Sequence, residues 1–206
     1  MKAHARRHAP VARSLGSQLT TSLLFTLALF AAAVPATAFE LATNGDFEDE
    51  LADGWQVSHQ GESSFCVRGR QLEEDADYEV VLYKGAGDGY ARLSQRIALP
   101  SLEATFSIRA QLEASRTGAG PWAAAAVLLF YRDQLGNLLA TTCIARHTAQ
   151  CPWSNTPEMH LISVPDEAWH TYAFTLREAL AYFTTLDLSR VAYLEVCIAT
   201  EVGYNC

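Results

Sequence analysis

The part of the chain that follows residue 38 is nearly free of lysine and lacks the short motifs of common catalytic sites. Lys84 is its single lysine. Its histidines show no His-Glu-x-x-His spacing, its cysteines show no Cys-x-x-Cys spacing, and no Gly-x-Ser-x-Gly sequence is present. These absences argue against zinc peptidases, thiolate metal sites and hydrolases with a nucleophile elbow.

Long apolar runs are also scarce, and the one near the N-terminus has the features of an export signal. It extends from Leu23 to Val34 and is followed by Ala36-Thr37-Ala38, a small-residue cleavage site. The run is shorter than the roughly 20 residues that a membrane-spanning helix needs, which disfavours the alternative of an N-terminal anchor. The charges before the run are all basic: Lys2, Arg6, Arg7 and Arg13. We therefore expect residues 1–38 to be a signal peptide and the protein to be secreted, extracellular or periplasmic.

Removal of residues 1–38 would leave 168 residues (206 minus 38) with a strongly acidic balance. All 23 Asp and Glu residues remain, whereas Lys plus Arg falls from 15 to 11, so the formal net charge changes from -8 to -12. Such a surface repels phosphate groups. We expect no nucleic acid and no membrane among the partners, and a neutral ligand or a cation fits better.

All five cysteines lie in the predicted exported part, where oxidation is permitted. Cys143 and Cys151 are close in sequence, and so are Cys197 and Cys206. This spacing favours two short disulfide-closed loops, Cys143 with Cys151 and Cys197 with Cys206, without proving the pairing. Cys66 is left over, and a small buried hydrophobic side chain is the simplest interpretation of it.

Apolar and polar residues alternate along much of the chain after residue 38. Between Glu103 and Glu113 every second residue is apolar, as in a half-buried strand, and Tyr90 to Ile97 repeats the pattern more loosely. Only Leu176 to Phe183 has a helical pattern. Turn residues separate further candidate strands at residues 55–59, 65–68, 78–83, 122–131, 138–144, 170–176 and 191–198. Many short strands with little helix predict a single β-sandwich or barrel domain over residues 39–206.

Four segments, taken in order, resemble a known family of bacterial domains. They are Asn44-Gly45-Asp46-Phe47-Glu48 followed by Trp55, then Gly89 to Gln95, then Ala125 to Tyr131 with Asp133, Gly136 and Asn137, and finally Trp169 to Tyr172. Together they are similar to carbohydrate-binding modules of the cellulose- and xylan-binding type. The resemblance implies an all-β, antiparallel jelly-roll β-sandwich of the galactose-binding-like kind. Such modules finish on a strand with an Asp-rich element, whereas this chain stops at Cys206, so we expect an atypical or missing last strand.

The resemblance also implies one structural calcium ion held by the Glu of the first motif, which is Glu48 here. If residues 44–48 are extended, Asn44, Asp46 and Glu48 lie on the face opposite Phe47. Their oxygen atoms suit a hard cation, so Asp46 and Glu48 are the predicted metal ligands. The alternative is a solvated acidic strand that Phe47 anchors to the core.

Sugar binding requires aromatic faces that stack on pyranose rings and planar polar side chains that bond to hydroxyl groups. Arg109 and Gln111 share the outward side of the strand predicted at 103–113 and are candidate ligand contacts; solvation of an exposed sheet is the alternative. Trp55 and Trp169 occupy positions where the resembled family packs its core. The remaining candidate ligand residues are aromatic: Tyr83, Trp122, Tyr131 and Trp153.

Three functions agree with these features. The first is a secreted, non-catalytic module that binds a neutral polysaccharide or glycan through an aromatic and polar sheet face. The second is an extracellular structural or adhesion domain without a sugar ligand. The third is a small secreted glycoside hydrolase or polysaccharide lyase, for which Glu73-Glu74 and Asp166-Glu167 are candidate acids, although adjacent acids in turns are more often solvated. The first function is the prediction, and no catalytic residue is assigned.

Overall fold

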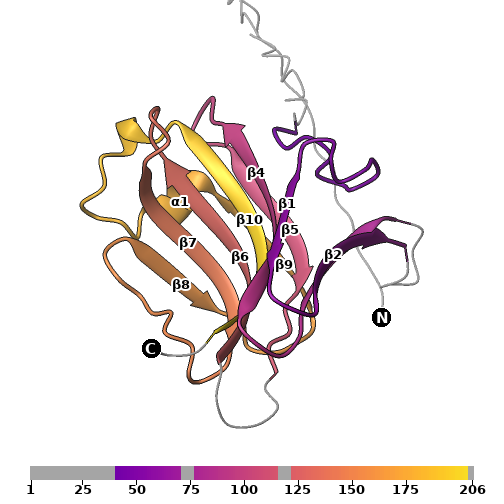
Figure 1. Cartoon of the computed structure of the whole chain (residues 1–206). Coiled ribbons are helices and arrows are strands. Elements are labelled where there is room, and N and C mark those ends of the chain that lie inside the picture. The colour runs from indigo at the N-terminus through magenta and orange to yellow at the C-terminus, as the bar shows by residue number, and fades with distance from the viewer. Residues whose placement is uncertain (1–39, 71–76, 116–121, 204–206) are drawn as a thin grey trace, which may run out of the picture. The chain divides into compact units, whose positions relative to one another are not determined.

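Ten strands and very little helix make up the part of the chain that the structure describes. The computed structural model describes residues 40–70, 77–115 and 122–203 (Figure 1). Its helical elements are α1 (Leu176–Leu180) and a 3₁₀ turn, η1 (Leu188–Arg190), and neither is long and apolar enough to cross a membrane. The strands are β1 (Gln56–Gln60), β2 (Ser64–Gly69), β3 (Glu79–Lys84), β4 (Gly89–Ala98), β5 (Thr105–Gln111), β6 (Trp122–Arg132), β7 (Leu138–His147), β8 (Met159–Ser163), β9 (Trp169–Thr175) and β10 (Tyr193–Gly203).

The main layer is a six-stranded sheet in the order β1-β4-β10-β6-β7-β8. All neighbours in it are antiparallel except β7 and β8, which are parallel. The central strand β6 is a nearly continuous apolar run because both of its faces are covered. Its residues Val127, Leu129 and Tyr131 face the inner core, whereas Ala126 and Leu128 face a second apolar cluster on the outer side.

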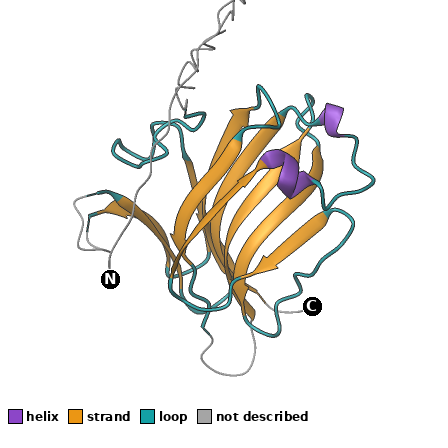
Figure 2. Ribbon diagram, turned by 180° about the vertical axis from the view of Figure 1, so that it is seen from behind, coloured by secondary structure: helices purple, strands orange, loops and turns teal. Residues whose placement is uncertain are grey.

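Two ribbons, β2-β3 and β5-β9, form the second layer on the inner side of the main sheet (Figure 2). In β5 the alternation places Phe106, Ile108 and Ala110 against the core and leaves Arg109 and Gln111 exposed. The predicted inward and outward sides of this strand are therefore correct. Layers of mainly antiparallel strands with little helix confirm the predicted all-β sandwich.

The connection from β7 to β8 covers the outer face of the main sheet. Parallel neighbours need such a crossover, since the chain must return to the same end before it re-enters the sheet. The crossover, residues 148–158, packs Trp153 against a cluster of small side chains. Cys143, Ala126 and Ala145 are fully buried in this cluster, and their small size leaves room for the indole.

The other predicted strands are present, with their bounds shifted by a few residues, and one further strand, β8, is present that was not predicted. The sequence pattern did not predict β8 because Met159–Ser163 is short and has no alternation of apolar and polar residues. The segment predicted at 191–198 forms most of β10, which continues to Gly203 in the centre of the main sheet. β10 is thus the final strand of the described residues, and it lies between β4 and β6.

Residues 44–48 form a loop rather than the predicted extended segment. Asn44 and Phe47 have φ values of 51° and 59°, in the left-handed region that strands do not use. The Asn44 side chain stabilises the loop, because Oδ1 accepts a hydrogen bond from Asp49 N (2.9 Å) and Nδ2 donates to Asp49 O (3.1 Å). Trp55 Nε1 donates to Asn44 O (2.9 Å) and joins the loop to the buried indole. The core position predicted for Trp55 is correct.

A polar pair lies in the centre of the inner core. Tyr131 of β6 is fully buried, and its hydroxyl lies 3.2 Å from Oγ1 of Thr142 in β7, which is also fully buried. Burial raises the pKa of Tyr131 to about 12. The ring packs edge-on against Phe183, just beyond α1. Tyr131 is therefore a core residue that no ligand reaches, and the prediction that it contacts a sugar is wrong.

Replacement of Tyr131 by Phe removes one partner of this pair and leaves the buried Thr142 hydroxyl without a hydrogen bond. We expect Tyr131→Phe to lower the free energy of unfolding by about 1–2 kcal/mol. Thr142→Val should have an effect of similar size. The double variant should lose less than the sum of the two, because no unpaired group remains. Urea denaturation of the four proteins measures this cycle, and strictly additive losses would contradict a direct bond.

Candidate functional site

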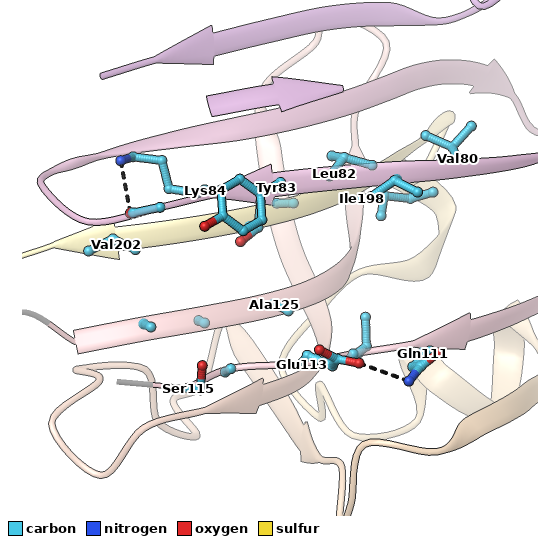
Figure 3. Close-up of a pocket in the computed structure, with 18 of the residues that line it drawn as sticks. Val80, Leu82, Tyr83, Lys84, Gln111, Glu113, Ser115, Ala125, Ile198 and Val202 are labelled. Carbon is cyan, nitrogen blue, oxygen red and sulfur yellow. Dashed lines mark hydrogen bonds between the residues drawn. The ribbon is translucent and has the colours of Figure 1, made fainter. Parts of the chain in front are cut away.

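A cleft opens in the second layer between β3 and the end of β5. Its volume is about 540 Å³. Strands β6 and β10 of the main sheet form its floor, at a place that neither ribbon covers (Figure 3). The lining residues include Tyr83 and Lys84 on the β3 side, Gln111, Glu113 and Ser115 on the β5 side, and Ala125, Ile198 and Val202 on the floor.

The floor of the cleft is recessed because the inward-facing side chains of β6 become smaller toward the start of the strand. Read backward along the strand, they are Tyr131, Leu129, Val127, Ala125 and Ala123. The first three fill the core; Ala125 lies at its border and lines the cleft together with Ala123. The sequence carries a signal for this hollow in the run Trp-Ala-Ala-Ala-Ala, but alternation of apolar and polar residues does not reveal it.

Lys84 stiffens the β3 wall. Its side chain is almost fully buried, and Nζ donates to three main-chain carbonyl groups: Glu62 O (3.0 Å), Gly85 O (3.1 Å) and Ala86 O (3.2 Å). An ammonium group has three donors, and all three are used here. Lys84 therefore connects the chain before β2 to the residues after β3. It has no donor left for a ligand.

Gln111 stiffens the opposite wall. Its Nε2 donates to Glu113 Oε1 (2.9 Å, Figure 3) and to Glu167 O (2.8 Å), which ties the end of β5 to the loop before β9. Both amide hydrogens are engaged in these bonds. The wall consequently presents acceptors, the Gln111 Oε1 atom and the Glu113 carboxylate, to which hydroxyl groups of a ligand would donate.

Two aromatic side chains border the cleft. Tyr83 is 49% exposed on the β3 side. Trp169 is half-buried and lies directly opposite Gln111 in the β5-β9 register, and the Arg109 guanidinium carbon is 4.9 Å from its ring centroid. The core position that the resemblance implied for Trp169 is therefore wrong. The signal for its outward position was the alternation of β9, because Tyr172 faces inward three residues later.

The rings of Trp122 and Trp153 lie on the outer face of the main sheet. Trp122 is directly opposite Gly203 in the β6-β10 register, and a Cβ atom at Gly203 would lie 2.8 Å from the indole, so that only glycine admits the ring there. The ring centroids of Trp122 and Trp153 are 5.9 Å apart. Trp122, the first residue of β6, also contributes to the lining at the end of the cleft. The structure thus places Tyr83 and Gln111 at the cleft and Arg109 beside it, whereas these two tryptophans support the opposite face.

Asp46 and Glu48, the predicted calcium ligands, bind main-chain amides. Asp46 Oδ1 accepts from Glu48 N (3.3 Å), and Glu48 Oε1 accepts from Tyr78 N (3.2 Å). No group of three or more His, Cys, Asp or Glu side chains suited to a metal ion occurs among the residues that the structure describes. Both carboxylates thus accept from main-chain amides in a loop, and the calcium ion stays a prediction from the resemblance.

The candidate catalytic acids do not form a pair in the cleft. Asp166 accepts hydrogen bonds from a main-chain amide and from His170 Nε2 (2.7 Å), which lower its pKa, so that it acts within its own loop. Residues 73–74 lie outside the described part of the chain. Among the described lining residues Glu113 is the single carboxylate. Glycoside hydrolysis generally needs two carboxyl groups across a cleft.

Comparison with known proteins finds similarity in structure. No protein-family model matches the sequence, and the curated proteins give no significant match. Solved structures similar to the chain include a carbohydrate-binding module from the β-sandwich superfamily (14% identity, TM-score 0.43, covering 82% of this chain and 58% of that one). A family 11 carbohydrate-binding module from a Clostridium thermocellum cellulosomal cellulase is also similar (15% identity, TM-score 0.37, covering 82% and 94%). The enzymatically active domain of tailspike protein 4 of bacteriophage CBA120 is a third (16% identity, TM-score 0.42, covering 80% and 20%).

These solved structures include modules of the kind that the sequence resembles, alongside one enzymatic domain. The chain spans a fifth of the tailspike chain and 58% of the first module's chain. At such TM-scores the similarity is one of general outline, so no residue of those proteins is carried over to this chain.

The described cysteines are free thiols. Cys143 and Cys151, predicted to form a disulfide, are not bonded, and Cys143 is fully buried on the outer face of β7. Cys197 lies within β10, and the chain continues from it as a strand to Gly203, so no short loop closes at this point. Its predicted partner, Cys206, lies outside the described residues.

Burial makes the thiols of Cys143 and Cys197 poor nucleophiles, because it raises the pKa of each to about 12. At pH 8 the thiolate fraction is then about a thousandfold lower than for an ordinary thiol with a pKa near 9. We expect iodoacetamide to alkylate both residues very slowly in the native protein, with a rate that keeps rising above pH 10, and rapidly after unfolding without reductant. Peptide mass spectrometry measures the rates. Absence of free thiols in the unreduced, unfolded protein would instead support the disulfide prediction.

Proposed function

We propose that this chain is a secreted, non-catalytic module that binds a neutral polysaccharide in the cleft between β3 and β5. The observation that carries the proposal is the presence, in one open cleft, of an apolar floor, aromatic side chains on both sides and a wall of hydrogen-bond acceptors. Export is the expectation from residues 1–38, which lie outside the described part of the chain.

The chemistry of the cleft matches that of a pyranose ring. A pyranose has an apolar face of C–H groups, which stacks on aromatic rings, and a rim of hydroxyl groups, which donate hydrogen bonds. Tyr83 and Trp169 supply the rings. Gln111 Oε1 and the Glu113 carboxylate supply acceptors. Because hydrogen bonds of Gln111 and the buried Lys84 already hold the two walls, little ordering is required when a ligand binds.

The charge of the site favours a neutral glycan over an acidic one. Glu113 is the only charged group on the described lining besides Lys84, whose three donors are engaged with main-chain carbonyls. The whole chain is acidic as well, with a formal charge of -8. A polysaccharide rich in carboxylate or sulfate groups would therefore be repelled.

The absence of a second carboxylate from the described lining supports a binding role rather than hydrolysis. Activity assays on the same polysaccharides test this part of the proposal separately. Release of reducing or unsaturated ends by the purified protein would show that it is an enzyme.

Affinity electrophoresis in gels that contain β-glucan, xylan or mannan tests the proposed site. We expect at least one of these polysaccharides to retard the protein, and Tyr83→Ala and Trp169→Ala each to weaken that retardation about tenfold or more, since each removes a stacking surface. Leu135→Ala is the control, because Leu135 is 88% exposed in the β6-β7 turn, away from the cleft. If none of the three retards the wild-type protein, the proposal fails and a structural or adhesive role takes its place.

A further inference from the structure

The outer face of the β2-β3 ribbon is apolar although it faces solvent. Cys66, Val80 and Leu82 occupy the inner face and pack on the core, as alternation requires. On the other face Phe65 is 42% exposed and Val67 is 48% exposed. A strand with one buried face normally carries polar residues on the opposite side, so this face indicates contact with something apolar.

Four side chains form this apolar face, and they are arranged in two directly opposed pairs. Phe65 is opposite Tyr83, and Val67 is opposite Val81. The rings of Phe65 and Tyr83 are nearly parallel, with centroids 5.1 Å apart and an interplanar angle of 22°. In such a stacked cross-strand pair each ring supports the other, and the face of each ring that is turned away from its partner is left for a ligand.

This face continues from the cleft. Val81 and Tyr83 belong both to the four-residue face and to the lining of the cleft, with Tyr83 at its edge (Figure 3). Phe65 and Val67 lie one strand farther out, on β2. A chain that leaves the cleft past Tyr83 would therefore meet Phe65 next.

We propose that Phe65, which lies on β2 beyond Tyr83 at the edge of the cleft, forms an additional binding position, and that the ligand is a linear glycan long enough to occupy both the cleft and this position. This inference rests on the proposed function and adds the length of the ligand to it. Phe65 contacts sugar units beyond those in the cleft, so that longer oligosaccharides bind more tightly than short ones.

The size of the face argues for a glycan rather than for a second copy of the chain. A stable protein interface buries roughly 800 Å² on each partner. Four side chains that are already half-buried cannot supply that area, whereas one aromatic pair suffices for a sugar ring. The acidic charge of the chain also opposes self-association.

Calorimetric titration with a homologous series from the retarding polysaccharide, from disaccharide to hexasaccharide, tests the inference. We expect the wild-type affinity to increase along the series, and Phe65→Ala to reduce hexasaccharide affinity about tenfold while leaving disaccharide affinity unchanged. Phe65→Tyr keeps the ring and should restore hexasaccharide binding. Leu135→Ala again serves as the control for loss of an exposed apolar side chain, and Phe65 is exposed enough that its removal should leave the fold intact.

Failure of the additional binding position can be told apart from failure of the cleft as a glycan site. If the wild type binds the series and Phe65→Ala binds the hexasaccharide equally well, the additional position is refuted while the cleft remains a glycan site. Equal weakening of disaccharide and hexasaccharide would place Phe65 within the cleft and also refute it. A dimer that Phe65→Ala converts to monomer, with glycan binding unchanged, would assign the face to self-association. If no oligosaccharide binds the wild type, the proposed function falls and the inference with it.

Discussion

Burial of both faces of the central strands β6, β7 and β10 is the constraint on which the rest of the structure depends. The middle parts of these strands are apolar on either side, so each side must be covered there by other elements. The two ribbons cover the inner side, and the crossover with Trp153 covers the outer side. The cleft exists because the inner cover is made of two separate ribbons, whose gap lies above Ala123 and Ala125.

The outer face is polar on the part of the main sheet that includes β4. Glu195 of β10 accepts from Arg132 of β6 (2.6 Å) and from Arg96 of β4 (3.2 Å), and Arg92 of β4 pairs with Glu201 farther along β10. These ion pairs join three neighbouring strands. Their contribution to stability is modest because several of the side chains are well exposed. These charged side chains make this part of the outer face polar, so that it can face water without a covering element.

The aromatic residues divide into three groups according to what covers them. Tyr131 fills the inner core, and its hydroxyl finds a partner in Thr142. Trp153 supports the crossover on the outer face. Tyr83 and Phe65 remain exposed on the ribbon beside the cleft, where no described element packs over them. Because the exposed rings are separate from the core rings, substitution of Tyr83 or Phe65 would leave the core packing intact. This arrangement is typical of a rigid scaffold that carries a surface site.

Local sequence patterns were sufficient for the strands because every second side chain of a strand meets the same environment. They failed where a short segment has no periodicity, as in β8, and where side-chain hydrogen bonds of Asn44 turn the chain out of an extended path. They also could not distinguish a ligand-binding aromatic from a core one, and so Tyr131 and Trp169 were assigned to the wrong environments.

By itself the sequence determined the strands other than β8, the apolar side of the alternating ones, and the acidic character of the chain. Only the tertiary structure decided that β3 and β5 stand apart above small residues, because the spacing of two ribbons depends on contacts between segments far apart in sequence. No periodicity within either strand encodes that distance, and it is this distance that makes the cleft.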